Sequence, residues 1–236
     1  MRPDNVIGMG TVSRGLVSGL LSGLVSGLVS RKRLRLTVLG ALLLSVAACR
    51  GQSSDTAAGG GEAAAIRGQR WVVGVLAGGG SGLFDRDDVQ FVRAGVRVGR
   101  VLTHEHGPGF LRGTLEWDAE IMPVDYVLWS DYRNVYGVGV NPLIVKWNFT
   151  RGRKVVPYFM AQGGVLWSAH NVPPGDTSHF NFLSGPGLGL NYFARPGRSW
   201  NIDLRSTHLS SASLGNHNPG VNASLQLSVG YNWWRQ

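Results

Sequence analysis

His208 and Ser210 are the residues of this sequence whose types and spacing point most directly to catalysis. A histidine beside a serine is the minimum for acyl transfer, because the imidazole can take the proton of the hydroxyl that attacks an ester. On an extended strand, residues two apart share a face with about 6.6 to 7 Å between their backbones, so the two side chains can meet. The spacing alone is common, and a hydrogen-bonded pair at the rim of a sheet is the usual alternative.

Two other motifs suggest chemistry but lack a necessary partner. Residues 104–106 (His-Glu-His) could direct two imidazoles to one metal, yet they fall in an expected turn and have no obvious third ligand. Residues 185–189 (Gly-Pro-Gly-Leu-Gly) are similar to a phosphate loop, but no helix is expected after them, and glycines lining a curved barrel are the simpler interpretation. The single cysteine excludes an intramolecular disulfide and a thiolate zinc site. We expect no metal and no cofactor.

The segment that carries the His-x-Ser pair alternates apolar and polar residues. Its two faces are marked by Trp200, Ile202 and Leu204 on one side and by Asn201, Asp203 and Arg205 on the other. Ser206, His208 and Ser210 continue the even, apolar series, so the pair is expected to emerge on that face near the end of the strand. If this face contacts lipid, the imidazole and the hydroxyl lie where a lipid ester can reach them, and the cost of polar groups there falls toward the membrane interface.

From residue 70 onward, apolar and polar residues alternate with a period of two, interrupted by Gly, Pro, Asn and Asp clusters. The pattern predicts eight strands near residues 70–78, 89–101, 110–123, 134–149, 155–167, 179–194, 199–210 and 221–234. An even number of antiparallel strands can close without an edge, as a bilayer requires, and most of these are long enough to cross one. We predict an all-β fold, an eight-stranded antiparallel outer-membrane β-barrel over residues 70–236.

Loop lengths and tryptophans favour a membrane barrel. The connections at residues 150–154 and 195–198 are tight, whereas residues 79–88, 124–133, 168–178 and 211–220 form longer ones, and residues 103–109 are intermediate. Short periplasmic turns and longer external loops alternate in this way in outer-membrane barrels. The eight tryptophans lie mainly toward strand ends, which is typical of an interfacial aromatic belt.

The polar faces of the predicted strands carry charges that need partners. We expect the odd residues of 111–121 and 221–233 to face lipid, and the even residues to face inward. Arg93 and Arg97 share the polar parity of their strand, and the residues that can face them across a narrow interior are Glu116, Asp118, Glu120, Asp203 and Arg205. A soluble ligand-binding barrel would have an apolar interior instead, and it is the alternative fold.

The first seventy residues differ from the rest. All 22 aromatic residues lie at or beyond Trp71, and residues 1–50 carry seven Lys or Arg against one Asp. A basic stretch at residues 31–35 precedes an apolar stretch that ends in small residues, as in a secretion signal, with cleavage after Ala48 or, as in a bacterial lipoprotein, before Cys49. We predict an N-terminal extension and signal peptide over residues 1–48 and a flexible linker over 49–69. Most of the positive charge lies in this leader, so we expect no nucleic-acid partner.

The residues that follow the His-x-Ser pair resemble a known family. The string His208-Leu-Ser210-Ser-Ala-Ser-Leu-Gly-Asn-His-Asn218-Pro-Gly220-Val-Asn222 and, more loosely, all eight strands resemble the PagL family of outer-membrane lipid A 3-O-deacylases. The resemblance implies a carboxylic ester hydrolase of the bacterial outer membrane that removes an acyl chain from lipid A or another acylated outer-leaflet lipid. The alternative function is a non-catalytic small barrel with a structural or surface-binding role.

The resemblance also implies roles for individual residues. Ser210 is the nucleophile, His208 its general base and Asn222 the third member of the triad, while Asn218 and Ser213 serve the oxyanion and Ser211 and His217 contact the substrate. The family usually has Glu where this chain has Asn222, fourteen residues after the histidine, and Asn where it has Ser211. An amide can hold the imidazole tautomer, but it lacks the negative charge that stabilises imidazolium.

Register makes a geometric prediction about Asn222. In a regular final hairpin, even residues of one strand share a face with odd residues of the next. Residue 222 therefore lies opposite His208 only if one of the two strands contains an extra, unpaired residue. We therefore predict a bulge near residues 206–209 or 222–225, a feature often found beside active sites. Without it, Asn222 points into the interior.

Overall fold

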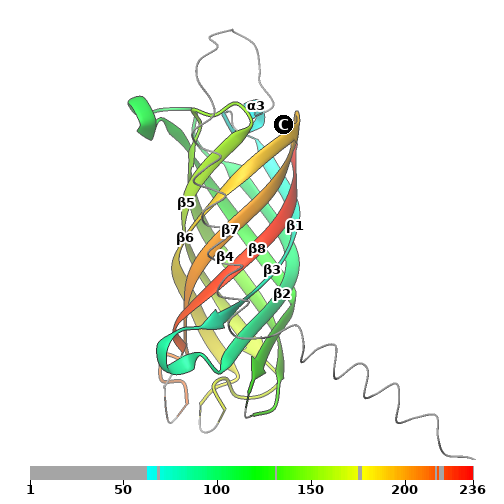
Figure 1. Cartoon of the computed structure of the whole chain (residues 1–236), viewed down its shortest axis with the longest axis vertical. Helices are drawn as coiled ribbons and strands as arrows, with labels where there is room; N and C mark the ends of the chain where they lie inside the picture. Colours follow the sequence, from blue (N-terminus) through cyan, green and yellow to red (C-terminus); the bar gives the residue numbers. More distant parts are fainter. Residues whose placement is uncertain are drawn as a thin grey trace, which may run out of the picture. The chain divides into compact units, whose positions relative to one another are not determined.

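Eight antiparallel strands pair in chain order and close into a barrel, with the last strand bonded to the first (Figure 1). The computed structural model describes residues 63–67, 70–130, 132–174, 177–215, 217 and 221–235. Its strands are β1 (Trp71–Gly82), β2 (Val89–Val101), β3 (Gly113–Trp129), β4 (Val135–Phe149), β5 (Val155–Ser168), β6 (Phe180–Arg195), β7 (Arg198–Ser210) and β8 (Val221–Arg235). Short turns of helix are α3 (Ala64–Arg67), η1 (Phe84–Arg86) and η2 (Gly109–Leu111). The predicted eight-stranded all-β barrel is confirmed.

The predicted secretion signal and both cleavage positions lie outside the described residues, so they stay predictions. Within the part of the chain that is described, no helix has the length and apolar composition needed to cross a membrane.

Two strands are longer than predicted. β1 runs on through a glycine-rich stretch because its neighbours approach closely there: a Cβ at Gly80 would overlap the backbone carbonyl oxygen of Leu225. β3 continues past Pro123, where the register with β4 shifts between Met122 and Asp125, and a bulge tolerates a proline that a regular ladder would not. Both stretches were predicted as loops because they lack regular alternation.

Loop lengths therefore differ from the prediction. The connections at one end, here called the loop end, are residues 83–88, 130–134, 169–179 and 211–220, and the first two are shorter than expected. At the opposite end, called the termini end, residues 150–154 and 196–197 are tight turns as predicted. Residues 102–112, however, form a connection as long as 169–179, so the two ends differ less in loop length than predicted.

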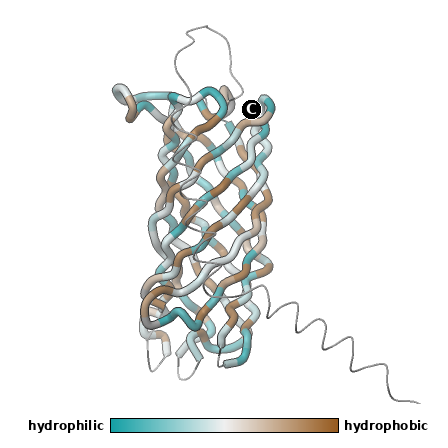
Figure 2. Tube along the Cα trace, in the orientation of Figure 1, coloured by the Kyte–Doolittle hydropathy of each residue, from teal (hydrophilic) through white to brown (hydrophobic). Residues whose placement is uncertain are grey.

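The outer face of the barrel is apolar and the middle of its interior is polar. Val73, Val96, Leu143 and Leu188 are each about half exposed on the outside, at 49 to 57%. Polar and apolar residues alternate along the strands in Figure 2. A soluble carrier would bury its apolar residues and expose its polar ones, so the soluble alternative is wrong.

Charged side chains in the interior pair with one another. Glu120 accepts from Arg97 Nη2 at 2.6 Å and from Arg205 Nη1 at 2.7 Å, and Arg205 Nε donates to Asp203 at 2.6 Å. Nearer the loop end, Arg93 Nη2 lies 2.8 Å from Asp125. Arg97 meets Asp118, Glu120 and Asp203 as predicted. Arg93 instead pairs with Asp125, and Glu116 with Lys146, which were not predicted as partners. These pairs satisfy ions that would otherwise be costly to bury.

Apolar clusters close the interior at both ends. At the termini end Ile66 of α3 packs with Phe193 and Trp234, and the Thr114 hydroxyl donates to the Ile66 carbonyl at 2.9 Å. Residues 63–67 were predicted as part of a flexible linker, and this packing corrects that expectation for them. At the loop end the cluster includes Trp129, so two of the eight predicted belt tryptophans, Trp129 and Trp234, lie inside instead.

Candidate active site

His208 and Ser210 lie on the outward face of β7, as the alternation predicts. The inward face of the strand holds Asn201, Asp203, Arg205, Thr207 and Leu209, all almost fully buried. The even residues lie on the other face, where Trp200 is 50% and Ile202 42% exposed and the His208 and Ser210 residues are half-buried. The imidazole and the hydroxyl therefore belong to the apolar exterior of the barrel, close to its loop end.

Leu209 fixes the orientation of this stretch. Its side chain is 1% exposed and belongs to the apolar cluster at the loop end, together with Leu183 and Val221. Because successive side chains on a strand point to opposite faces, anchoring Leu209 inside directs the residues before and after it outward. Apolar packing within the barrel thus positions the two polar groups on its surface.

Small side chains lie level with His208 on the neighbouring strands, whereas a phenylalanine lies level with Ser210. In the ladder between β6 and β7, Ser184 lies opposite His208 and Phe182 opposite Ser210. One strand further, Gly163 of β5 pairs with Ser184. A Cβ built on Gly163 would meet nothing closer than a methyl carbon of Leu143 at 4.0 Å. On the β6 side, the neighbours level with His208 therefore leave room on the outer surface.

The ladder between β7 and β8 contains the predicted bulge. Thr207 pairs with Ser224 and Leu209 pairs with Val221, so β8 advances by one residue more than β7 between these two pairs. The backbone of residues 222 and 223 lies across from His208. One consequence corrects the predicted face of β8: Val221 is fully buried in the interior, not lipid-facing.

Side chains from two neighbouring strands bond Thr207 beside the bulge. The Ser224 hydroxyl donates to the Thr207 carbonyl at 2.9 Å. The Gln162 side-chain amide, on β5, donates to the Thr207 hydroxyl at 2.9 Å. Both bonds are buried, and they hold the residue that directly precedes the outward His208.

A tight turn follows Ser210. The Leu214 N–H donates to the Ser211 carbonyl at 3.0 Å, and the two residues between, Ala212 and Ser213, have φ of 49° and 62°. Two residues with positive φ in the middle of such a turn are typical of type I′ geometry, and non-glycine residues there cost on the order of 1–3 kcal/mol each. The Ala212 N–H donates to the Ser210 hydroxyl oxygen at 3.1 Å. Strain of this kind clusters at functional sites.

The other predicted site residues differ in their exposure and in how much of them the structure describes. Ser213 is exposed on this turn, and His217 is exposed in the same connection. Ser211 is 2% exposed, so its predicted contact with substrate is not supported and its carbonyl instead closes the turn. Asn218 lies outside the described residues, and for Asn222 the backbone alone is described.

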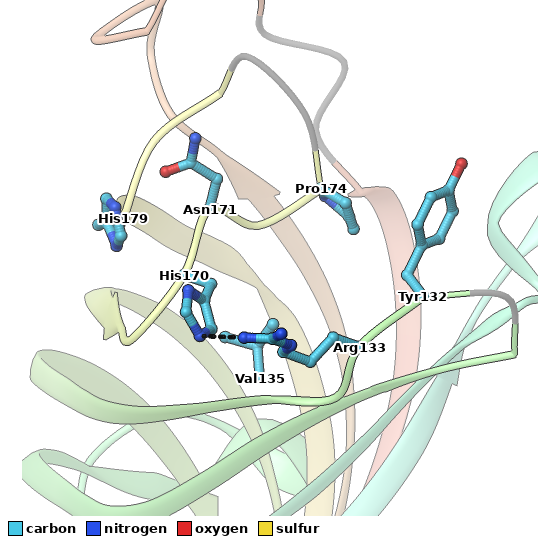
Figure 3. Close-up of a pocket in the computed structure, with 7 residues that line it drawn as sticks. All are labelled: Tyr132, Arg133, Val135, His170, Asn171, Pro174 and His179. Atoms are coloured by element: carbon cyan, nitrogen blue, oxygen red, sulfur yellow. Dashed lines mark hydrogen bonds between the residues drawn. The ribbon is translucent and has the colours of Figure 1, made fainter.

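A pocket at the loop end was missed by sequence reasoning. It has a volume of about 400 Å³ and is lined by residues of the connections 130–134 and 169–179, Arg133, His170 and His179 among them (Figure 3). Sequence reasoning assigned no role to Arg133 or to either histidine. The sequence gives no signal for this grouping, because Arg133 and His170 come from different connections and lie side by side only once β4 pairs with β5.

The His-Glu-His stretch has other contacts than a metal. Glu105 accepts from Arg112 Nη2 at 2.7 Å, and His106 stacks edge-on against Trp147 with ring centroids 4.9 Å apart. Arg112 directly precedes β3 and is exposed. The prediction that it faces inward, with the other even residues of 111–121, is therefore wrong. Within the described part of the chain, no three His, Cys, Asp or Glu side chains gather in a way that could hold a metal ion.

Comparisons with known proteins identify relatives of the chain. The family model for PagL, described as lipid A 3-O-deacylase, matches residues 92–232. No curated protein sequence matches. Similar solved structures include the crystal structure of the outer membrane enzyme PagL, with 19% identity, a TM-score of 0.42, and coverage of 68% of this chain and 98% of that one. They also include the N-terminal β-barrel domain of Pseudomonas aeruginosa OprF, with 17% identity, a TM-score of 0.43, and coverage of 70% of this chain and 100% of that one. A third is Neisserial surface protein A, with 15% identity, a TM-score of 0.41, and coverage of 70% of this chain and 96% of that one.

Proposed function

Because the chain belongs to the PagL family of lipid A 3-O-deacylases, we propose that it hydrolyses an ester-linked acyl chain of lipid A, or of a related outer-leaflet lipid, with Ser210 as nucleophile and His208 as general base. The protein is a bacterial outer-membrane β-barrel, and its family acts on lipid A. The predicted family, fold and localisation are thereby confirmed, whereas the catalytic residues are our proposal.

One observation carries the assignment to these two residues. A histidine and a serine occupy adjacent outward positions on an apolar barrel surface, near the loop end. Polar side chains on a lipid-facing surface carry a free-energy cost, which a folded protein accepts where they serve a purpose. An ester in the outer leaflet lies at about the depth of the strand ends, so the hydroxyl meets its substrate without entering the barrel.

The proposed reaction has two steps. His208 takes the Ser210 proton while the Ser210 oxygen attacks the ester carbonyl, and the imidazolium then returns the proton to the departing alcohol of the glycolipid, which leaves an acyl-serine. Water, deprotonated by the same imidazole, attacks the acyl-serine carbonyl, and the imidazolium returns that proton to the Ser210 oxygen as the fatty acid departs. The chemistry uses an imidazole, a hydroxyl and water, and it requires no metal or cofactor.

Donors for the oxyanion come from the connection that follows Ser210. We assign the role to Asn218 together with the turn that carries Ser213, since donors aimed at the developing negative charge usually contribute most to such reactions. The Ala212 N–H already donates to the Ser210 oxygen, so this turn lies beside the reacting atom. The bulge sets residue 222 across from His208, and we assign Asn222 to hold the imidazole tautomer.

The test compares two serines of the same strand and face. Ser210→Ala should abolish release of fatty acid from lipopolysaccharide, measured by mass spectrometry as loss of one acyl chain. Ser206→Ala should retain nearly full activity, because Ser206 shares the outward face of β7 but lies on the far side of His208 from Ser210. Both variants should show the heat-dependent shift in gel mobility of a folded barrel.

Three results would contradict the proposal. Release of fatty acid by Ser210→Ala would remove Ser210 from the mechanism. Equal loss of activity in both variants would mean that the exterior of β7 binds lipid without supplying the nucleophile. A folded wild-type protein that leaves lipid A and simple esters intact would favour the non-catalytic barrel.

A further inference from the structure

The pocket at the loop end has the chemistry of an anion site. Figure 3 shows Arg133 and His170 pointing toward one another, with Arg133 Nη1 3.3 Å from His170 Nε2. A guanidinium can only donate, so Nε2 accepts and the imidazole proton resides on Nδ1. The other N–H groups of the guanidinium and the Nδ1–H of His170 are then donors of the kind that phosphate oxygens accept.

The charge of Arg133 is not balanced within this pocket by the described residues. Those that line it are neutral or basic, and none is a carboxylate. His179 adds a second imidazole, whose Nδ1–H donates to the Ser168 carbonyl at 3.0 Å, which leaves Nε2 as an acceptor for a hydroxyl of the phosphate or of the sugar. A volume of about 400 Å³ is ample for a phosphate and part of the sugar that bears it.

The pocket lies beside the candidate active site. His179 directly precedes β6, the strand that pairs with the end of β7 at Ser210. The loops are in contact as well, since a Cβ at Gly215, in the turn after Ser210, would overlap the Thr177 backbone. With strands about 4.8 Å apart, the ends of β4 and β5 that carry the pocket are two to three strand spacings, about 10 to 14 Å, from β7. One lipid molecule can span that separation.

We propose that this pocket binds a phosphate group on the headgroup of the same glycolipid whose ester lies at His208 and Ser210. The inference rests on the proposed function and adds a positioning site for its substrate. Phosphate held at Arg133 fixes the headgroup at the loop end, which limits how the acyl esters can present themselves to Ser210. The pocket therefore contributes to affinity and to the choice of ester, and not to the chemical step.

The kinetic test uses two substrates and a matched arginine. With purified protein in mixed micelles, Arg133→Gln should raise KM for lipid A about tenfold with little change in kcat. For lipid A whose phosphates have been removed by phosphatase, wild type and Arg133→Gln should have the same KM. Arg86→Gln is the control, because Arg86 also lies at the loop end but does not line the pocket. Unchanged KM in Arg133→Gln, or the same rise in Arg86→Gln, would overturn the proposal.

A binding test separates the pocket from catalysis. The affinity of the Ser210→Ala variant for lipid A micelles should fall about tenfold when Arg133→Gln is added. Removing the phosphates from the lipid should lower the affinity of Ser210→Ala itself by the same amount. If Arg133 instead governs binding of inorganic phosphate alone, with lipid A binding unaffected, the site serves the free ion and the proposal is wrong. If wild type hydrolyses no ester but lipid A binding depends on Arg133 and on phosphate, the proposed function fails and the pocket assignment stands.

Discussion

By its resemblance to the family, the chain has Asn222 at a position where a glutamate is expected, and in the proposed mechanism the difference bears on how His208 is activated. A side-chain amide and a carboxylate can both accept a hydrogen bond from the imidazole N–H and so hold the same tautomer. Only the carboxylate adds an attraction for the positive charge that the imidazole gains when it takes the Ser210 proton. The wild-type enzyme should therefore work with less transition-state stabilisation than this position allows.

We expect Asn222→Glu to raise kcat for lipid A deacylation by about tenfold, equivalent to roughly 1.4 kcal/mol of added stabilisation. Asn222→Ala should lower it, because nothing then orients the ring. Asn222→Gln is the matched control, since it has the length of glutamate without the charge. A fall in activity with glutamate, or an equal rise with glutamine and glutamate, would show that Asn222 does not act on His208 through charge.

Single residues were predictable from sequence where strand alternation governs them. The outward face of His208 and Ser210 follows from Trp200 and Ile202 on the same strand, because the extra residue of the bulge lies on β8 and leaves the alternation of β7 intact. Ser211 could not be placed in this way, since it begins a turn whose backbone leaves the extended conformation. Arg133 could not be found either, because its partner His170 comes from another loop.

The hairpin of β7 and β8 is the element that assembles the site. Beside its bulge, which lies between Thr207 and Leu209, the buried Ser224 hydroxyl donates to the Thr207 carbonyl. The alternation of even and odd residues on the two strands predicted one extra, unpaired residue here if His208 and Asn222 were to lie opposite each other. The sequence did not specify which strand absorbs it, because a bulge depends on bonds such as this one between side chain and backbone.

We expect Ser224→Ala to lower kcat about tenfold while KM changes little. Loss of its hydroxyl removes a buried hydrogen bond to the Thr207 carbonyl, which costs about 0.5–1.5 kcal/mol and relaxes the bulge that positions residue 222. Ser224→Thr should restore activity because it restores the donor. The readout is deacylation kinetics on protein that passes the gel-mobility test for a folded barrel.

Ser228→Ala is the control for this position. Ser228 is equally buried on the same face of β8, but it pairs with Asp203 in the regular part of the ladder. A similar drop in kcat for both serines would mean that any polar loss in β8 weakens the protein, and the special role of the bulge would be rejected.

The length of an element was harder to predict than its existence. β2 begins and ends where its alternation does, at Val89 and Val101. β3 extends to Trp129 because hydrogen bonds from β2 and β4 hold it on both sides after Pro123 interrupts the pattern. Neighbouring strands contribute these bonds, and a pattern read along one segment does not contain them.

At the scale of the whole molecule, the barrel reverses the usual arrangement, with apolar side chains outside and ions inside. The apolar outer face contacts lipid, which is as apolar as the side chains themselves, so burial of this face adds no hydrophobic driving force. Contacts across the interior therefore depend on paired charges and on the apolar clusters at the two ends. Glu120 is central to this cohesion, because it bonds both Arg97 and Arg205 from strands on different sides of the barrel. The charged residues were predictable from parity, whereas their partners required the closed barrel.

Removing the charge of Glu120 should destabilise the barrel strongly. Glu120→Gln leaves two buried guanidinium groups with one carboxylate fewer, and breaking a buried ion pair from one side typically costs about 3–5 kcal/mol. Glu120→Gln combined with Arg205→Met removes one charge of each sign, so the double variant should be more stable than Glu120→Gln alone. Urea unfolding in detergent micelles, followed by gel mobility, is measured for the wild type, Glu120→Gln, Arg205→Met and the double variant. The three differences in stability from the wild type are the values that a double-mutant cycle compares. Destabilisation equal to the sum of the two single changes would mean that Glu120 and Arg205 contribute independently, and the paired-charge explanation of the interior would be wrong.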